Sequence, residues 1–169
     1  MEVERCHLNK AYFTQKIFFI SDEATIVGTA QSSVLRASGI WMYASKLIDG
    51  LGLDGRFSNE NGCAHSDRNN DASIEWFSLE LQAPAKITRV QIAPDMDLRM
   101  TNVRITIGPS MVYDPDEPLC LPEIPALVHQ PGLQDYACNG DLHEGKFVKI
   151  ARAGVLDLCE VKVFTLAGK

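Results

Sequence analysis

The chain has 169 residues and a formal net charge of -6, with 46% hydrophobic and 22% charged residues. These values are typical of one soluble globular domain that is large enough to bury a core. The acidic balance argues against nucleic acids and anionic membrane surfaces as general partners. No apolar run approaches the roughly 20 residues of a membrane helix. The start lacks the features of a signal peptide, so we expect the signal of an exported form to lie outside this sequence.

Short runs with β-strand character dominate the chain. Residues 1–29 are expected to form an N-terminal extension, with extra strands packed on a domain of residues 30–169. A single helical turn is predicted over residues 42–49, ending at Gly50. Beyond it, apolar and polar residues alternate at period two in runs bounded by Gly, Pro, Asn and Asp. The predicted strands are 74–81, 87–92, 103–107, 146–150 and 159–164. This pattern indicates an all-β sandwich or barrel.

Five cysteines and a proline-rich stretch complete the pattern. The stretch 109–140 shows little periodicity and is too long for an ordinary loop in a compact domain. No CxxC or CxxH spacing is present, which argues against zinc. Disulfides are favoured over reduced cytosolic cysteines, although spacing alone does not fix their connectivity. Cys6 is expected to be the odd cysteine, either free or linking two chains.

Five segments occur in an order that resembles a known family. They are residues 30–33 (Ala-Gln-Ser-Ser), 43–50 (ending Ile-Asp-Gly), 62–65 (Gly-Cys-Ala-His), 76–81 (Trp-Phe-Ser-Leu-Glu-Leu) and 158–161 (Leu-Cys-Glu-Val). Together they resemble the F-type lectin (fucolectin) domain of the discoidin, or coagulation factor 5/8 C, family. The resemblance implies a discoidin-like jelly-roll sandwich in a secreted, non-enzymatic carbohydrate-binding protein. It also implies two internal disulfides, Cys63–Cys159 and Cys120–Cys138.

The implied sugar site departs from the family pattern. In the family, fucose is held by a histidine, then Arg-x-Asp, then a further Arg or Lys. His65 matches the histidine, but Asp95 stands where the first arginine is expected. Asp97 matches the aspartate, and Arg99 is left as the basic residue for the last position. A carboxylate in place of a guanidinium reverses a central donor, so we expect fucose binding to be weakened or lost. The site then binds another glycan, or none; Arg99 is alternatively a scaffold residue paired with Asp95 or Asp97.

The resemblance also implies a structural calcium site between the loop 49–56 and the strand that follows Cys159. Calcium prefers six to eight oxygen ligands, many of them carbonyls, so a glycine-rich loop with one or two acids suits it. The expected contributors are Leu51, Asp54, Arg56, Gly62, Cys159 and Glu160.

Enzyme activity is not expected, since the chain has no HExxH, GxSxG, P-loop or GxGxxG motif. Asp95 and Asp97 are a poor glycosidase pair, because such carboxylates usually come from separate elements. Glycans or glycoproteins are therefore the expected partners, and weak single-site binding makes a homo-oligomer plausible. The alternative is a protein-recognition domain that kept the fold and lost the sugar site. Lipid-surface binding would need exposed apolar loop tips, for which Trp41 and Met42 are the candidates.

Overall fold

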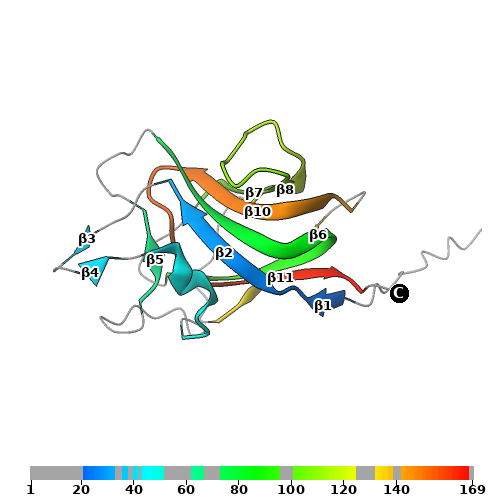
Figure 1. Ribbon diagram of the computed structural model, residues 1–169. Helices are drawn as coiled ribbons and strands as arrows, with labels where there is room; N and C mark the ends of the chain where they lie inside the picture. Colours follow the sequence, from blue (N-terminus) through cyan, green and yellow to red (C-terminus); the bar gives the residue numbers. More distant parts are fainter. Residues whose placement is uncertain are drawn as a thin grey trace, which may run out of the picture.

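A computed structural model describes residues 21–32, 36–37, 40–41, 43–51, 62–66, 73–95, 101–124, 132–138 and 142–167. Their secondary structure is almost entirely β (Figure 1). The elements are β1 Ser21–Glu23, β2 Ile26–Gln31, β3 Arg36–Ala37, β4 Ile40–Trp41, η1 Ala44–Ile48, β5 Ala64–His65, β6 Ile74–Pro94, β7 Val103–Gly108, β8 Leu119–Ile124, β9 Gln134–Ala137, β10 Glu144–Ala153 and β11 Asp157–Leu166. The all-β prediction is confirmed.

The long strand β6 belongs to both layers of the sandwich. Its first half pairs with β2 and β10, and that layer continues from β10 to β7 and β8. Its second half pairs with β11 and β9, while β1 and β5 pair with β11. In Figure 1, β6 runs along one layer, turns, and returns in the other. Both ends of β6 therefore lie at one end of the sandwich, which we call the loop end.

The period-two pattern places one face of each strand in the core between the layers. The buried apolar side chains come from both halves of β6 and from the strands paired with it. They include Phe77, Leu79, Leu81, Val90, Ile92, Ile105, Val148, Ile150, Val161 and Val163. Full burial of such a side chain contributes roughly 1.5–3 kcal/mol, so this set is the main stabilising feature of the fold.

Two details differ from the sequence prediction. The strands expected at 74–81 and 87–92 form one continuous strand, since Ala85 and Lys86 still pair with Gly145 and Glu144. Pro84 thus lies within a strand that bends, rather than ending it. The proline-rich stretch contains β8 and β9, which pair with β7 and β6.

The predicted helical turn is confirmed as the 3-10 helix η1.

Both predicted disulfides are confirmed. Cys63 is bonded to Cys159 and Cys120 to Cys138, across sequence separations of 96 and 18 residues. Such bonds persist in oxidising compartments, so the structure fits an extracellular protein. Cys6 lies outside the described residues. In the part of the expected N-terminal extension that the structure describes, β1 pairs with β11, and β2 continues across the expected boundary to pair with β6.

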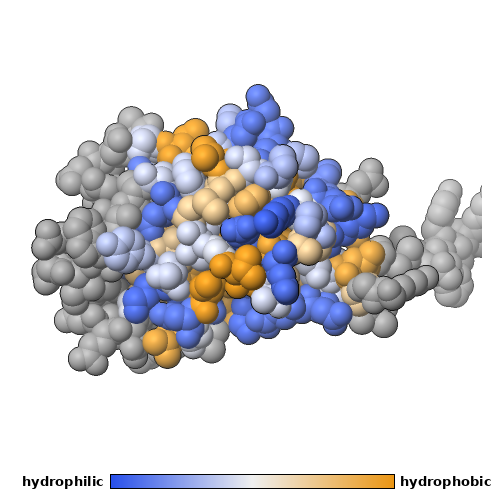
Figure 2. All heavy atoms as spheres, in the orientation of Figure 1, coloured by the Kyte–Doolittle hydropathy of each residue, from blue (hydrophilic) through white to orange (hydrophobic). Residues whose placement is uncertain are grey.

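The surface is mixed in character. Figure 2 shows hydrophobic residues in separate small areas among hydrophilic ones. The exposed large apolar residues are Val27, Tyr43, Ile48, Leu51, Ile74, Val112 and Leu166. The side chains of Trp41 and Met42 lie outside the described set. Within the described ranges, no helix has the length and apolar character needed to cross a membrane.

Candidate functional site

Strand β5 fixes His65 at the loop end. Ala64 and His65 pair with Leu158 and Asp157 of β11, and the adjacent Cys63 is bonded to Cys159. Ser66 continues this attachment at Leu156, whose N–H donates to the Ser66 hydroxyl at 2.8 Å. The Ser66 N–H donates to the Leu156 carbonyl at 3.0 Å. A strand of two residues is thus held by one covalent bond and a set of hydrogen bonds.

Gln31, at the end of β2, ties three elements to the same place. Its side-chain Nε2 donates to the His65 carbonyl at 3.3 Å. Its Oε1 accepts a hydrogen bond from the Ala44 N–H at the start of η1. Gln31 belongs to the segment 30–33 that carried the family resemblance, and these two bonds give that segment a physical role in holding β5.

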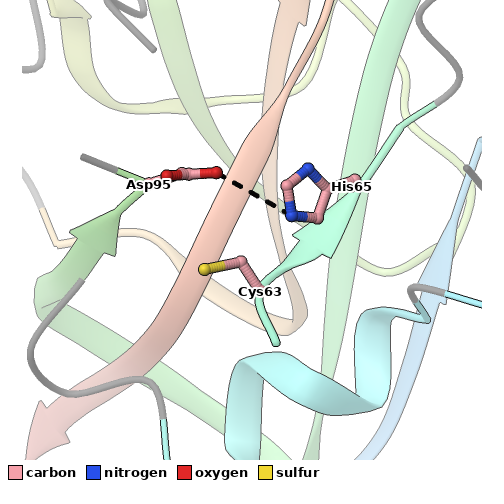
Figure 3. A group of neighbouring side chains, drawn as sticks. All are labelled: Cys63, His65 and Asp95. Carbon is pink, nitrogen blue, oxygen red and sulfur yellow. Dashed lines mark ion pairs between the residues drawn. The ribbon is translucent and has the colours of Figure 1, made fainter. Parts of the chain in front are cut away.

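The imidazole of His65 lies between two carboxylates. Its Nδ1 is 3.1 Å from Oδ2 of Asp157. Its Nε2 is 3.8 Å from Oδ2 of Asp95, the pair marked by the dashed line in Figure 3. The three side chains are at most 3% exposed. The Asp95 N–H also donates to the Asp157 carbonyl at 3.3 Å, which joins the end of β6 to the start of β11. We call these three side chains the loop-end cluster.

Cys63 completes the group drawn in Figure 3. Its Sγ, a ring nitrogen of His65 and a carboxylate oxygen of Asp95 all lie within 4.8 Å of one another. A cysteine binds metal as a thiolate. The sulfur of Cys63 is already bonded to Cys159, so it offers no thiolate ligand while the disulfide is intact. The chemistry of this group therefore comes from the imidazole and the carboxylates.

The structure brings together two of the four expected sugar-site residues. His65 and Asp95 are in contact, whereas Asp97 and Arg99 lie outside the described residues. His65 is only 2% exposed, so its imidazole lies beneath the surface. Sequence reasoning missed Asp157. The available signal was an acid inside the apolar run Val-Leu-Asp-Leu-Cys of residues 155–159, directly before a disulfide cysteine.

The expected calcium region is assembled in part. The Gly50 N–H donates to Oε2 of Glu160 at 3.1 Å, and Gly50 has the positive φ of 74° that favours glycine. Glu160 is 3% exposed. Burial raises the pKa of its carboxyl to about 7, an effect that the Gly50 hydrogen bond partly opposes. Leu51 is exposed and Gly62 is half-buried. Asp54 and Arg56 lie outside the described residues.

These features define a class of fold: the discoidin-like β-sandwich used by F-type lectins and carbohydrate-binding modules. No protein-family model and no curated protein matches the sequence. Solved structures do share the fold. A fucolectin from striped bass (Morone saxatilis) serum has a TM-score of 0.67 at 22% identity, covering 84% of this chain and 46% of that chain. The chain thus spans less than half the length of that fucolectin.

Two shorter proteins are similar along almost their whole length. The fucose-binding module SpX-3 of Streptococcus pneumoniae has a TM-score of 0.59 at 20% identity, covering 83% of this chain and 94% of that one. The family 32 carbohydrate-binding module of C. perfringens NanJ, solved with galactose, has a TM-score of 0.61 at 18% identity, covering 86% and 99%. These likenesses confirm the fold that the sequence predicted.

Proposed function

We propose that this protein is a secreted, non-catalytic carbohydrate-binding module whose site lies at the loop end. The observation that carries the proposal is the contact between His65 and Asp95. It occurs between His65, which matches the histidine of the family's fucose motif, and Asp95, which occupies the position of its first arginine. The similar solved structures include proteins described with fucose and with galactose, so this fold is used with more than one sugar.

The ligand is a glycan or glycoprotein other than the standard fucose ligand. A guanidinium at position 95 would donate charge-assisted hydrogen bonds to sugar hydroxyls. Asp95 is instead a carboxylate that faces an imidazole, and ionised carboxylates only accept hydrogen bonds. Because His65 and Asp95 are buried, they act as positioning groups, and direct contact with the sugar is assigned to Asp97 and Arg99. Avidity through a homo-oligomer fits such a single weak site.

A structural calcium ion is part of the proposal. The buried Glu160 carboxylate has a raised pKa, so its ionised form lacks enough compensating positive charge. A cation held there would supply that charge. Beside Glu160, we assign the site to the same expected contributors. These are the Asp54 carboxylate and the backbone carbonyls of Leu51, Arg56, Gly62 and Cys159. Calcium accepts such a mixture of carbonyls and carboxylates.

A broad glycan array, run with calcium, tests the sugar-binding proposal. The variants are Arg99→Ala and His65→Ala, with Arg89→Ala as the control. Arg89 forms an exposed ion pair with Asp135 at 3.0 Å, at the other end of the second half of β6. We expect specific binding by the wild type and the control, and its loss in both loop-end variants. A fucose-only profile would contradict the altered specificity.

The second candidate is a protein-recognition domain, favoured by the burial of His65 and Asp95. A blank array from a folded, disulfide-bonded protein would support it and overturn the lectin proposal. Competition separates the two directly. Soluble glycan displaces the partner of a lectin and has no effect on a protein-recognition domain.

A further inference from the structure

A small pocket lies on the outer face of the sandwich, near its loop end, over the start of β6, the start of β7 and the end of β10. It has a volume of about 190 Å³ and is lined by Ile74, Asn102, Arg104, Tyr113, Ala151, Arg152 and Ala153. The strand register explains the hollow. Ala151 of β10 pairs with Trp76 of β6 on one side and with Arg104 of β7 on the other. A small side chain between two large ones leaves room above the sheet.

Tyr113, in the β7–β8 connection, forms one wall of the pocket. We call this connection, residues 109–118, the strap; Figure 1 shows it beside β7 and β8. The strap is fastened to the sheet by Lys149, whose side chain is fully buried. Lys149 Nζ donates to the Ser110 carbonyl at 2.7 Å and forms an ion pair with Glu117. Thr106 also donates to Glu117, at 3.3 Å. Tyr113 lies between these attachment points, so its position beside the sheet is largely preformed.

The charge of the pocket is positive in a chain that is acidic as a whole. Among the described residues, no carboxylate forms an ion pair with Arg104. Arg152 donates from Nη1 to the Val155 carbonyl at 2.6 Å, and no described group accepts from its buried Nε. Burial lowers the pKa of Arg152, with Asp157 acting in the opposite direction. Arg104 would therefore gain from a bound anion, whereas Arg152 already interacts with Asp157 and the Val155 carbonyl.

We propose that this pocket binds the carboxylate-bearing ring of an acidic sugar, a hexuronate, as a second site that is independent of the loop-end proposal. Guanidinium groups match the fork geometry of a carboxylate. Tyr113 and Ile74 provide apolar contact for the ring, and the Asn102 amide offers both a donor and an acceptor. The volume is below the roughly 300–1,000 Å³ of pockets for drug-sized ligands, so it suits a single ring.

Amide NMR on the ¹⁵N-labelled full chain tests this site. The probes are galacturonate, galactose as the neutral ring, and acetate as the carboxylate alone. We expect galacturonate to shift the amides of residues 102–104, 113 and 151–153, and the other two probes to leave them unchanged at equal concentration. Arg104→Gln should raise the Kd for galacturonate about tenfold or more, since a charge-assisted contact is lost. Tyr113→Leu should also weaken binding, while the control Arg89→Gln should not.

Several outcomes would overturn the proposal. If galactose shifts these amides as much as galacturonate does, the pocket does not recognise the carboxylate. If acetate does so, the pocket does not recognise the sugar ring. An unchanged Kd in a folded Arg104→Gln protein, or no shift at these amides, would place any binding elsewhere. The loop-end proposal fails separately, because its test includes His65→Ala, and His65 is not among the described residues that line this pocket.

Discussion

Among the buried charged groups of the sandwich, two sets can be compared because they are built differently. Under the strap, the Lys149 ammonium forms an ion pair with the Glu117 carboxylate and also donates to the Ser110 carbonyl. In the loop-end cluster, one imidazole faces two carboxylates, Asp95 and Asp157. The strap pair balances its charge within the fold. The loop-end cluster instead combines two carboxylates with one imidazole, and Arg152 interacts electrostatically with Asp157.

This difference separates a structural role from a functional one. A buried pair is retained when its partners satisfy each other, and removing one partner is strongly destabilising. Clusters of several buried titratable groups, by contrast, are often found at functional sites. We therefore expect changes under the strap to act mainly on folding, and changes at the loop end to act on binding as well.

The largest expected effect concerns the covalent anchor of the loop-end cluster. By the chain-entropy model, removing Cys63–Cys159 with the pair Cys63→Ala and Cys159→Ala should cost about 5 kcal/mol of unfolding free energy. The shorter Cys120–Cys138 loop should cost about 3 kcal/mol on the same basis. Urea unfolding of both double variants measures the difference. The reverse order would mean that β5 is held mainly by its hydrogen bonds.

The strap pair should give the next largest effect. Lys149→Met leaves the Glu117 carboxylate without its cation and should cost about 3–5 kcal/mol. The double variant Lys149→Met with Glu117→Leu should recover most of that loss, because no unpaired charge remains. Lys162→Met is the matched control, since Lys162 pairs with an exposed Glu23 at 3.0 Å and should cost below about 1 kcal/mol. Thermal and urea unfolding report all three. Equal losses of unfolding free energy in Lys149→Met and in the control would show that the buried pair contributes no more than an exposed one.

Within the loop-end cluster, the two carboxylates should be unequal. Asp157 lies 3.1 Å from the imidazole and Asp95 lies 3.8 Å away, so the first contact is the stronger. Asp157→Asn should cost roughly 1–3 kcal/mol, while Asp95→Asn should cost less than about 1 kcal/mol. Glycan binding is expected to change more in Asp95→Asn, since Asp95 leads directly to Asp97 and Arg99, which are proposed to contact the sugar. A larger stability loss in Asp95→Asn would reverse these assignments.

The smallest expected effect depends on pH. The folded-state pKa of Glu160 is about 7, above the ordinary value of 4.5, so the stabilisation by its protonated form is complete below about pH 4.5 and lost as the pH rises through 7. In EGTA at pH 8, Glu160→Gln should therefore raise the unfolding free energy by roughly 1–2 kcal/mol. At pH 4 the variant should match the wild type.

Calcium should reverse the sign of that effect, because a bound cation stabilises the ionised carboxylate. Melting curves of the wild type and Glu160→Gln, each with calcium and with EGTA, measure both signs. A wild type that calcium does not stabilise at pH 8 would contradict the calcium site. The pH effect in EGTA would still stand by itself.

The sequence predicted the parts of this fold that carry a repeated signal. Alternation identified both halves of β6 and the strands β7, β10 and β11. It did not locate β5, whose two residues are too short to show a period. The three-residue β1 falls in residues 1–29, where extra strands were expected without bounds. Alternation also missed β8, where prolines hide a strand that β7 and a disulfide hold in place. Pairing with distant strands decides the conformation of such segments.

At the candidate site, the sequence marked two positions through a family motif. His65 and Asp95 were identified from neighbouring residues, and the structure places them in contact. The burial of His65 was not evident, since it depends on Asp157 and on Gln31, which lie far from it along the chain. The outer-face pocket carries no motif. It results from the register that places Ala151 between Trp76 and Arg104, which a single strand does not reveal.

The double membership of β6 has a consequence for how the chain is made. A ribosome releases β6 long before β10 and β11, which complete its two layers. Until then its two apolar faces and strand edges stay open, and such edges favour aggregation. The Cys63–Cys159 disulfide likewise cannot form until Cys159 has been synthesised. Closure of the sandwich is thus a late event, and we expect chaperones and disulfide isomerases to act on the nascent chain during this interval.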